Sequence, residues 1–183
     1  KYITEEQFRN IIKLDSVGQF YKDTFQIYYH TGCRRKEIIA GQLKNNILII
    51  PADISKTNTQ REITLEPWQI KIVKTIHEEK IKFLNKGYKL ENFMGNISKT
   101  FKKACNELKI NRKLHNLRHS YAVRLYLITN DIYEVKNLLG HSSVITTEIY
   151  ATFNLDLLKN DFPSDYKVRK KIDEIRKNNI CTT

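Results

Sequence analysis

The sequence has few of the features that mark membrane, secreted or metal-dependent proteins. It contains no run of about 18 apolar residues and no signal-peptide pattern, so we expect an intracellular, cytoplasmic protein without a membrane partner. Its three cysteines, Cys33, Cys105 and Cys181, stand far apart, which favours reduced thiols over a disulfide framework or a zinc site. No acidic cluster suggests a two-metal nuclease, and we expect no metal or cofactor.

Charge and length set the broad class of the protein. The 183 residues are 40% apolar and 28% charged, as expected for a globular domain with a core of its own. The net charge of +12 indicates a polyanionic partner, most simply nucleic acid. Usage rich in Lys, Asn and Ile is also typical of AT-rich genomes, so the charge alone does not decide the partner. The chain begins at Lys1 without Met, and we expect a fragment of a longer protein.

Apolar spacing predicts a mainly α-helical chain with a small antiparallel β-hairpin or sheet, an α+β fold. Gly32 and Gly140 are predicted to end helices, Asp131 to cap one, and Pro67 to open one. The predicted helices cover residues 4–14, 19–29, 67–76, 93–108, a segment beginning at 115, 131–139, a short segment that contains Tyr150, and 164–178. The apolar face of the helix over 131–139 is assigned to Ile132, Val135, Leu138 and Leu139. The predicted strands cover 47–50 and 62–65.

Two short segments carry the chemistry. His115 and Arg118 are three residues apart, so on a helix both point toward one spot beside its first turn. A guanidinium offers a permanent charge and a planar fork of donors for phosphate oxygens, and an imidazole can move a proton near neutral pH. Further on, His141 follows the helix end at Gly140, and Tyr150 adds a phenol. An isolated HxxR pattern is more often a solvated helix face, so the pair alone decides nothing.

Together with upstream motifs, these segments resemble the C-terminal catalytic domain of the tyrosine recombinase, or phage integrase, family. The family pattern is HxLRH, then LGH, then a tyrosine nine residues later, and the chain has these at 115–119, 139–141 and Tyr150. The family's first arginine lies in a TGxRxxE context, which matches Thr31 to Glu37 around Arg34. The family's catalytic lysine lies on a β-hairpin, where this chain has Lys56.

The resemblance implies site-specific DNA cleavage and rejoining through a 3′-phosphotyrosyl intermediate. Arg34 and Arg118 would stabilise the transition state, and His115 would act as general base. Lys56 would protonate the leaving 5′ oxygen, and His141 would hydrogen-bond a non-bridging oxygen. Tyr150 would be the nucleophile. Glu37 could orient a neighbouring cation or be an ordinary first-turn carboxylate.

The resemblance also implies an organisation and partners. Residues 1–155 would form the catalytic domain and 156–183 a tail with a docking helix, which could equally be a frayed end. The family's N-terminal DNA-clamping domain is expected to lie outside this chain. The substrate would be double-stranded DNA, on which the protein would assemble as a homo-tetramer. Arg112 and Lys113, just ahead of His115, are predicted to contact the DNA backbone.

Several alternatives stay open at this point. A non-catalytic DNA-binding module derived from a recombinase fits the basic composition, and a type IB topoisomerase-like enzyme uses a similar site. Asn116 and Cys33 depart from the residues usual in the family, which puts fine tuning in doubt rather than the reaction class. Lys99, Lys102 and Lys103 could face phosphates or only solvent.

Overall fold

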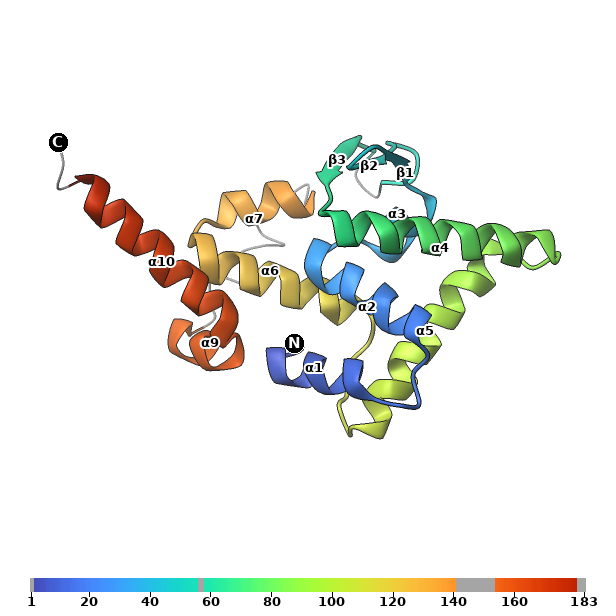
Figure 1. The fold of residues 1–183 in the computed structure, drawn as a ribbon, viewed down its shortest axis with the longest axis horizontal. Coiled ribbons are helices and arrows are strands. Elements are labelled where there is room, and N and C mark those ends of the chain that lie inside the picture. Colours follow the sequence, from blue (N-terminus) through green and yellow to red (C-terminus); the bar gives the residue numbers. More distant parts are fainter. Residues whose placement is uncertain (1, 56–57, 141–153, 181–183) are drawn as a thin grey trace. The chain divides into compact units, whose positions relative to one another are not determined.

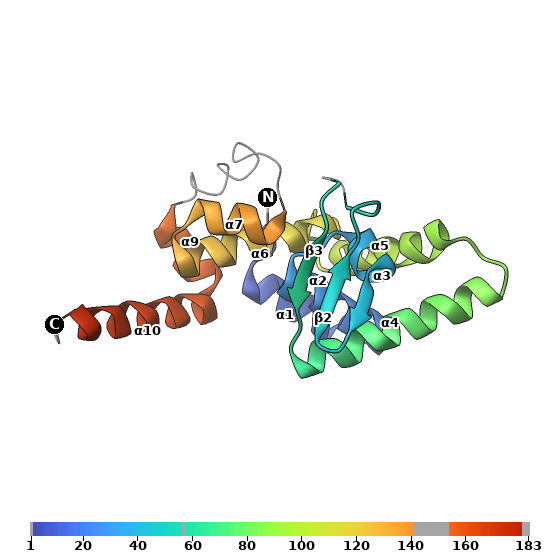
Figure 2. The ribbon, with the colours of Figure 1, turned by 90° about the horizontal axis from the view of Figure 1, so that it is seen from above.

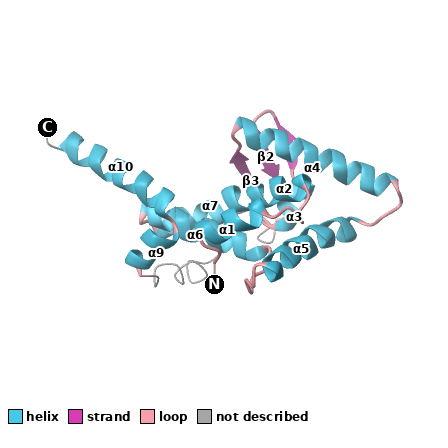
Figure 3. Ribbon diagram, turned by 60° about the horizontal axis from the view of Figure 1, so that its bottom comes forward, coloured by secondary structure: helices cyan, strands magenta, loops and turns pink. Residues whose placement is uncertain are grey.

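The computed structural model describes residues 2–55, 58–140 and 154–180, and the side chains only as far as residue 176 (Figure 1). The chain forms two compact units, one made of residues 1–3 and 7–121 and the other of residues 4–6 and 122–183. Helices dominate both units, and the strands form one small sheet in the first (Figure 3). The predicted α+β class is therefore confirmed. Within the described ranges, no helix combines the length and the apolar character needed to cross a membrane.

The helices of the first unit follow the predicted order. Gly32 ends the second of them in the left-handed conformation (φ 63°), and Pro67 opens the fourth, both as predicted. The helix from Pro67 continues well beyond the predicted Ile76, and a short helix follows Arg34, where the sequence offered a helix only as one alternative for Glu37. The helices are α1 (Glu5–Lys13), α2 (Gln19–Thr31), α3 (Arg35–Ala40), α4 (Pro67–Asn85), α5 (Leu90–Glu107) and the start of α6 (His115–Thr129).

Aromatic side chains hold the core of this unit together. Phe25 of α2 meets Phe101 of α5 edge-on, with ring centroids 4.8 Å apart and both side chains fully buried. Phe8 of α1 stacks on Tyr29 of α2 at 3.8 Å. Pairs of this kind contribute about 0.5–1.5 kcal/mol beyond the burial of their area. They fix α1 and α5 against α2, the helix whose C-terminal end leads into the candidate site.

The sheet is three-stranded and antiparallel, with the order β1-β2-β3 (Figure 2). Its strands are β1 (Gln42–Lys44), β2 (Ile47–Ile50) and β3 (Arg61–Thr64). The pairing of Ile50 with Arg61 closes the ladder between β2 and β3, and the connection between these strands contains position 56. The predictions of β2 and β3 are confirmed, whereas β1 was missed. It is only three residues long and joins β2 through a turn in which Asn45 has a positive φ of 54°.

The short helix α3 is held at its C-terminal end by α4. His77 Nε2 donates a hydrogen bond to the carbonyl oxygen of Ile38 at 2.8 Å, and Lys80 Nζ donates to that of Ile39 at 2.8 Å. These carbonyls belong to the last turn, which lacks intrahelical partners. Two side chains of α4 therefore fix the end of a helix too short to be stable alone.

The second unit contains the end of α6 and the helices α7 (Ile132–Leu139), α9 (Leu155–Asp161) and α10 (Pro163–Ile180). The Asp131 carboxylate caps α7 by accepting from the N–H groups of Tyr133 and Glu134, and Gly140 ends this helix at φ 65°, as predicted. The assignment of Leu138 to the apolar face of α7 is wrong, because its side chain is 46% exposed. At 100° per residue, Leu138 falls outside the stripe of Ile132, Val135 and Leu139.

Ion pairing fixes the start of α10 within the second unit. Arg124 of α6 forms two hydrogen bonds with the Asp165 carboxylate, at 2.8 and 3.1 Å. Arg169 Nη1 donates to the carbonyl oxygen of Leu127 at 3.0 Å. Further along α10, the apolar side chains of Val168 and Ile175 are exposed.

Candidate active site

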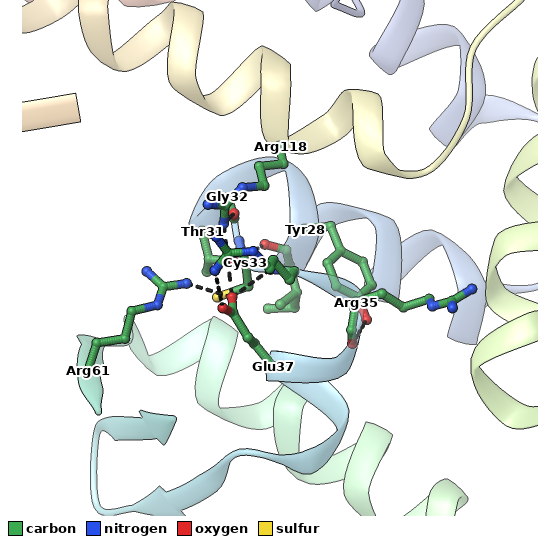
Figure 4. Close-up of polar contacts among 10 residues, drawn as sticks. Tyr28, Thr31, Gly32, Cys33, Arg35, Glu37, Arg61 and Arg118 are labelled. Atoms are coloured by element: carbon green, nitrogen blue, oxygen red, sulfur yellow. Dashed lines mark hydrogen bonds and ion pairs between the residues drawn. The ribbon is translucent and has the colours of Figure 1, made fainter. Parts of the chain in front are cut away.

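A buried carboxylate, Glu37, lies at the centre of the candidate site in the first unit (Figure 4). Gly32 ends α2, and Arg34 stands at the N-cap of α3, so that Glu37 falls in the first turn of this short helix. Its Oε2 accepts a hydrogen bond from the backbone N–H of Arg34 at 2.7 Å. A carboxylate at a helix N-terminus satisfies an orphan donor and complements the helix dipole.

Three guanidinium groups surround this carboxylate, and they come from three separate elements. Arg34 Nη1 lies 2.7 Å from Oε1, and Arg61 Nη2, at the start of β3, lies 2.6 Å from Oε2. Arg118 Nη1, on α6, lies 4.0 Å from the same Oε2. Three permanent cations around one anion leave an excess of positive charge, which suits an anionic ligand.

Glu37 and Arg118 are both ionised at neutral pH, despite their burial. Burial of the Glu37 carboxyl raises its pKa, but the charge of Arg61 and the hydrogen bonds from Arg34 outweigh it, so the net pKa is lowered. Burial lowers the pKa of Arg118, and the charge of Arg34 lowers it further, to about 10. At neutral pH Glu37 is therefore an anion and Arg118 a cation.

Arg118 is oriented by the end of α2. Its Nη1 donates a hydrogen bond to the carbonyl oxygen of Gly32 at 2.7 Å, and its side chain is only 4% exposed. Gly32 itself packs so closely under Tyr121, one turn along α6, that a Cβ added to it would overlap the tyrosine ring. The loop that follows α2 and the first turns of α6 are thus fixed to each other.

A basic pocket of about 490 Å³ adjoins this cluster through Cys33. His115, at the start of α6, lies on its wall with an exposed side chain, and its ring meets that of His119 edge-on at 4.8 Å. Arg35 is fixed on the pocket wall by a hydrogen bond of 2.7 Å to Ser98 Oγ of α5. The described residues that line the pocket include no acidic side chain; they are Tyr28, Cys33, Arg35, Ser98, Lys99, Lys102, Lys113, Leu114 and His115.

The thiol on this wall is buried and stays protonated at neutral pH. Cys33 is buried, and burial raises the pKa of its thiol to about 11, although the nearby charge of Arg61 lowers it. In the ranges that the structure covers, no group of three or more His, Cys, Asp or Glu side chains is placed to hold a metal ion.

The structure brings together only part of the predicted residue set. Arg34, Glu37 and Arg118 share one cluster, and His115 lies on the wall of the adjoining pocket. Lys56, His141 and Tyr150 lie outside the described residues, so their roles stay predictions.

The two predicted DNA contacts differ in their surroundings. Lys113 lines the basic pocket. Arg112 donates to the backbone carbonyls of Tyr2 and Asn111, at 2.8 and 2.9 Å, which gives its guanidinium a role inside the unit.

The sequence motifs end at Arg61 but gave this residue no role, and they could not separate the lysines of α5. Arg61 begins a strand of alternating burial, and the only signal in the sequence is a long basic side chain just after the polar turn of a hairpin. Of the lysines, Lys99 and Lys102 line the pocket, whereas Lys103 is exposed elsewhere on α5. Successive side chains of a helix point about 100° apart, so Lys102 and Lys103 face different directions. The sequence does not show which of these directions faces a pocket.

Solved structures share this fold at low sequence identity. The Tn1549 transposon integrase, solved in complex with transposon right end DNA, matches with a TM-score of 0.64 and 15% identity, over 96% of this chain and 66% of that one. A lambda integrase tetramer bound to a Holliday junction matches with a TM-score of 0.59 and 19% identity, over 82% of this chain and 47% of that one.

Sequence comparison points the same way. A probable integrase/recombinase protein of Methanocaldococcus jannaschii is 29% identical over 143 residues, which are 69% of this chain and 43% of that protein. The chain therefore spans less than half the length of this relative. The model of the phage integrase family matches residues 1–155, which is most of the sequence, and the chain belongs to that family.

Proposed function

We propose that this chain is the catalytic part of a site-specific DNA recombinase, which cleaves and rejoins strands through a 3′-phosphotyrosyl link at Tyr150. One observation carries the proposal. Arg34 and Arg118, from motifs far apart in the sequence, converge on the buried carboxylate of Glu37. A structural ion pair would need one arginine, whereas this cluster keeps an excess of positive charge beside a basic pocket.

The charge excess fits phosphoryl transfer. A phosphodiester carries one negative charge, and a five-coordinate transition state concentrates about two on its oxygens, so fixed cationic donors stabilise it more than the ground state. Arg118, with a pKa of about 10, stays charged throughout the neutral range. We assign Arg34 and Arg118 to the non-bridging oxygens of the scissile phosphate, with Glu37 orienting Arg34 and the Gly32 carbonyl orienting Arg118.

The remaining roles are assigned from the motifs. His115 removes the proton of the Tyr150 hydroxyl, whose unperturbed pKa of about 10 otherwise keeps it protonated at neutral pH. Lys56 protonates the departing 5′ oxygen, and His141 hydrogen-bonds a non-bridging oxygen. The phosphotyrosyl link retains the energy of the broken bond, so a 5′ hydroxyl from another strand can attack it and restore a phosphodiester.

The substrate that suits this surface is double-stranded DNA. The pocket beside His115 presents Arg35, Lys99, Lys102 and Lys113, and none of the described residues on its wall is acidic. We place the strand that carries the scissile phosphate along this pocket. We keep Arg112 and Lys113 as proposed contacts to the DNA backbone, and the Arg112 guanidinium also holds the backbone at Tyr2.

Assembly on DNA follows from the same class of reaction, because exchange joins strands from two duplexes. The lambda integrase was solved as a tetramer on a Holliday junction. We propose a homo-tetramer here, formed on DNA inside the cell. The exposed Val168 and Ile175 of α10 offer an apolar surface to a neighbouring subunit.

The test is covalent capture of DNA. The full-length protein is incubated with a duplex from the DNA flanking its gene, nicked near the crossover so that the cleaved strand diffuses away. We expect an adduct that resists denaturation and is lost in Tyr150→Phe. Tyr133→Phe, which alters an exposed tyrosine of α7, is the matched control and should form the adduct normally.

The outcomes separate the rival readings. Tight DNA binding without any adduct would contradict the proposal and favour a non-catalytic DNA-binding module. Adducts on duplexes of unrelated sequence, with relaxation of supercoils by a monomer, would indicate a topoisomerase-like enzyme instead.

A further inference from the structure

Arg61 is the one cation of the cluster that the motifs leave without a role. It stands at the first position of β3, paired with Ile50 across the ladder, directly after the connection that contains Lys56. Figure 4 shows its side chain reaching from β3 to Glu37 on α3. Its guanidinium is 14% exposed, and the carboxylate that it meets is fully buried.

The contacts at Glu37 limit what a further donor can reach. An ionised carboxylate accepts about four hydrogen bonds, two on each oxygen. Oε2 already accepts from the Arg34 N–H at 2.7 Å and from Arg61 Nη2 at 2.6 Å. Arg118 Nη1 lies 4.0 Å from this oxygen, beyond hydrogen-bonding distance, and donates to the Gly32 carbonyl instead.

Arg61 also provides the strongest electrostatic support for Glu37. Burial disfavours the ionised carboxylate, and the charge of Arg61 is the largest effect opposing it. A buried carboxylate that loses such a partner draws in the nearest remaining cation, since an uncompensated buried charge is costly. Among the described residues, Arg118 is a cation that lies close to Oε2, at 4.0 Å, without being hydrogen-bonded to it.

We propose that Arg61 is a positioning residue, which saturates Glu37 so that Arg118 stays directed toward the scissile phosphate. Without Arg61, the Arg118 guanidinium closes onto Glu37 and leaves its place at the phosphate. This inference rests on the proposed recombinase function and deepens it. A displacement of about 1 Å at a reacting centre can cost on the order of a hundredfold in rate.

The test compares Arg61→Met, Arg61→Lys, Glu37→Gln and the double variant Arg61→Met/Glu37→Gln in the full-length protein. The rate of adduct formation on the nicked duplex is measured in a single turnover at saturating protein, alongside the dissociation constant for DNA and the melting temperature. We expect Arg61→Met to slow the adduct at least about tenfold, with little change in DNA affinity. Arg61→Lys, which keeps a charge at Oε2, should recover most of the rate.

The double variant separates positioning from direct contact. In the Glu37→Gln background there is no anion to capture Arg118, so adding Arg61→Met should change the rate by less than about threefold. An equal loss in both backgrounds would show that Arg61 touches the DNA itself and would overturn the inference. Wild-type rates in a folded Arg61→Met protein would overturn it as well.

Two further measurements keep the result interpretable. Glu62→Gln alters the exposed neighbour of Arg61 on β3 and should leave the rate unchanged. If Arg61→Met does not fold, the comparison passes to Arg61→Lys, whose smaller loss should likewise vanish in the Glu37→Gln background. Absence of an adduct in the wild-type protein would refute the proposed function, an outcome distinct from failure of the variants to differ.

Discussion

Gly32 carries two constraints that a single methyl group would break. Its φ of 63° lies in the left-handed region, and an added Cβ would overlap the ring of Tyr121. We expect Gly32→Ala to destabilise the protein by roughly 2 kcal/mol or more, from the left-handed backbone together with overpacking. The Gly32 carbonyl also orients Arg118, so adduct formation should slow beyond what the loss of folded protein explains.

Chemical denaturation and the single-turnover assay check this expectation together. Gly95→Ala is the matched control, because Gly95 lies inside α5 with nothing within 4 Å of an added Cβ. That change should stabilise the protein by about 0.5–1 kcal/mol, since alanine favours a helix interior over glycine. Equal effects of the two substitutions would contradict the role given to Gly32.

At the scale of elements, α3 depends on α4 for its C-terminal end, and this dependence makes stability sensitive to pH. Burial lowers the pKa of His77, despite its hydrogen bond to the Ile38 carbonyl. The folded protein therefore binds this proton more weakly than the unfolded chain does. Neutral His77 therefore contributes to the free energy of unfolding at neutral pH, and this contribution is lost as the pH falls below the unfolded pKa of about 6.5.

Unfolding free energies measured from pH 7.5 to pH 5 test the role of His77. We expect the wild type to lose stability relative to His77→Gln as the pH falls, because glutamine does not titrate but keeps an N–H donor for Ile38. Lys80→Met removes the neighbouring contact to Ile39 and also the charge that helps to lower the pKa of His77, so this variant should be less stable at pH 7.5 and should lose less stability than wild type as the pH falls. A constant gap between wild type and His77→Gln would refute the assignment.

The same elements show what the sequence could and could not predict. The ends of α2 and α7 were predictable, because Gly32 and Gly140 mark left-handed positions and Asp131 is a capping residue. Strand β1 and helix α3 were not, since both are too short for periodicity and are stabilised by β2 and α4. Motif spacing indicated Arg34 and Arg118, but only three-dimensional pairing relates Arg61 to Glu37.

At the scale of the whole molecule, we expect the basic residues behind the net charge of +12 to contribute unequally to DNA binding. Charge far from a bound strand attracts DNA only weakly at physiological salt, because the Debye length is about 8 Å. Lysines on the pocket wall lie within that distance of a strand placed there. The proposed path of the DNA therefore predicts which lysines set the salt dependence of binding.

The pair Lys99 and Lys102 against Lys103 provides the comparison, because all three lie on α5 and only the first two line the pocket. Each phosphate contact that is lost should reduce the slope of log K against log salt by about 0.9. We expect Lys99→Gln/Lys102→Gln to reduce the slope by the amount that corresponds to nearly two lost phosphate contacts. Lys103→Gln should leave the slope almost unchanged. Fluorescence anisotropy with one labelled duplex between 50 and 200 mM salt measures this. If Lys103→Gln reduced the slope as much per residue, the DNA would run over a different face of α5, and the assignment of the pocket would be wrong.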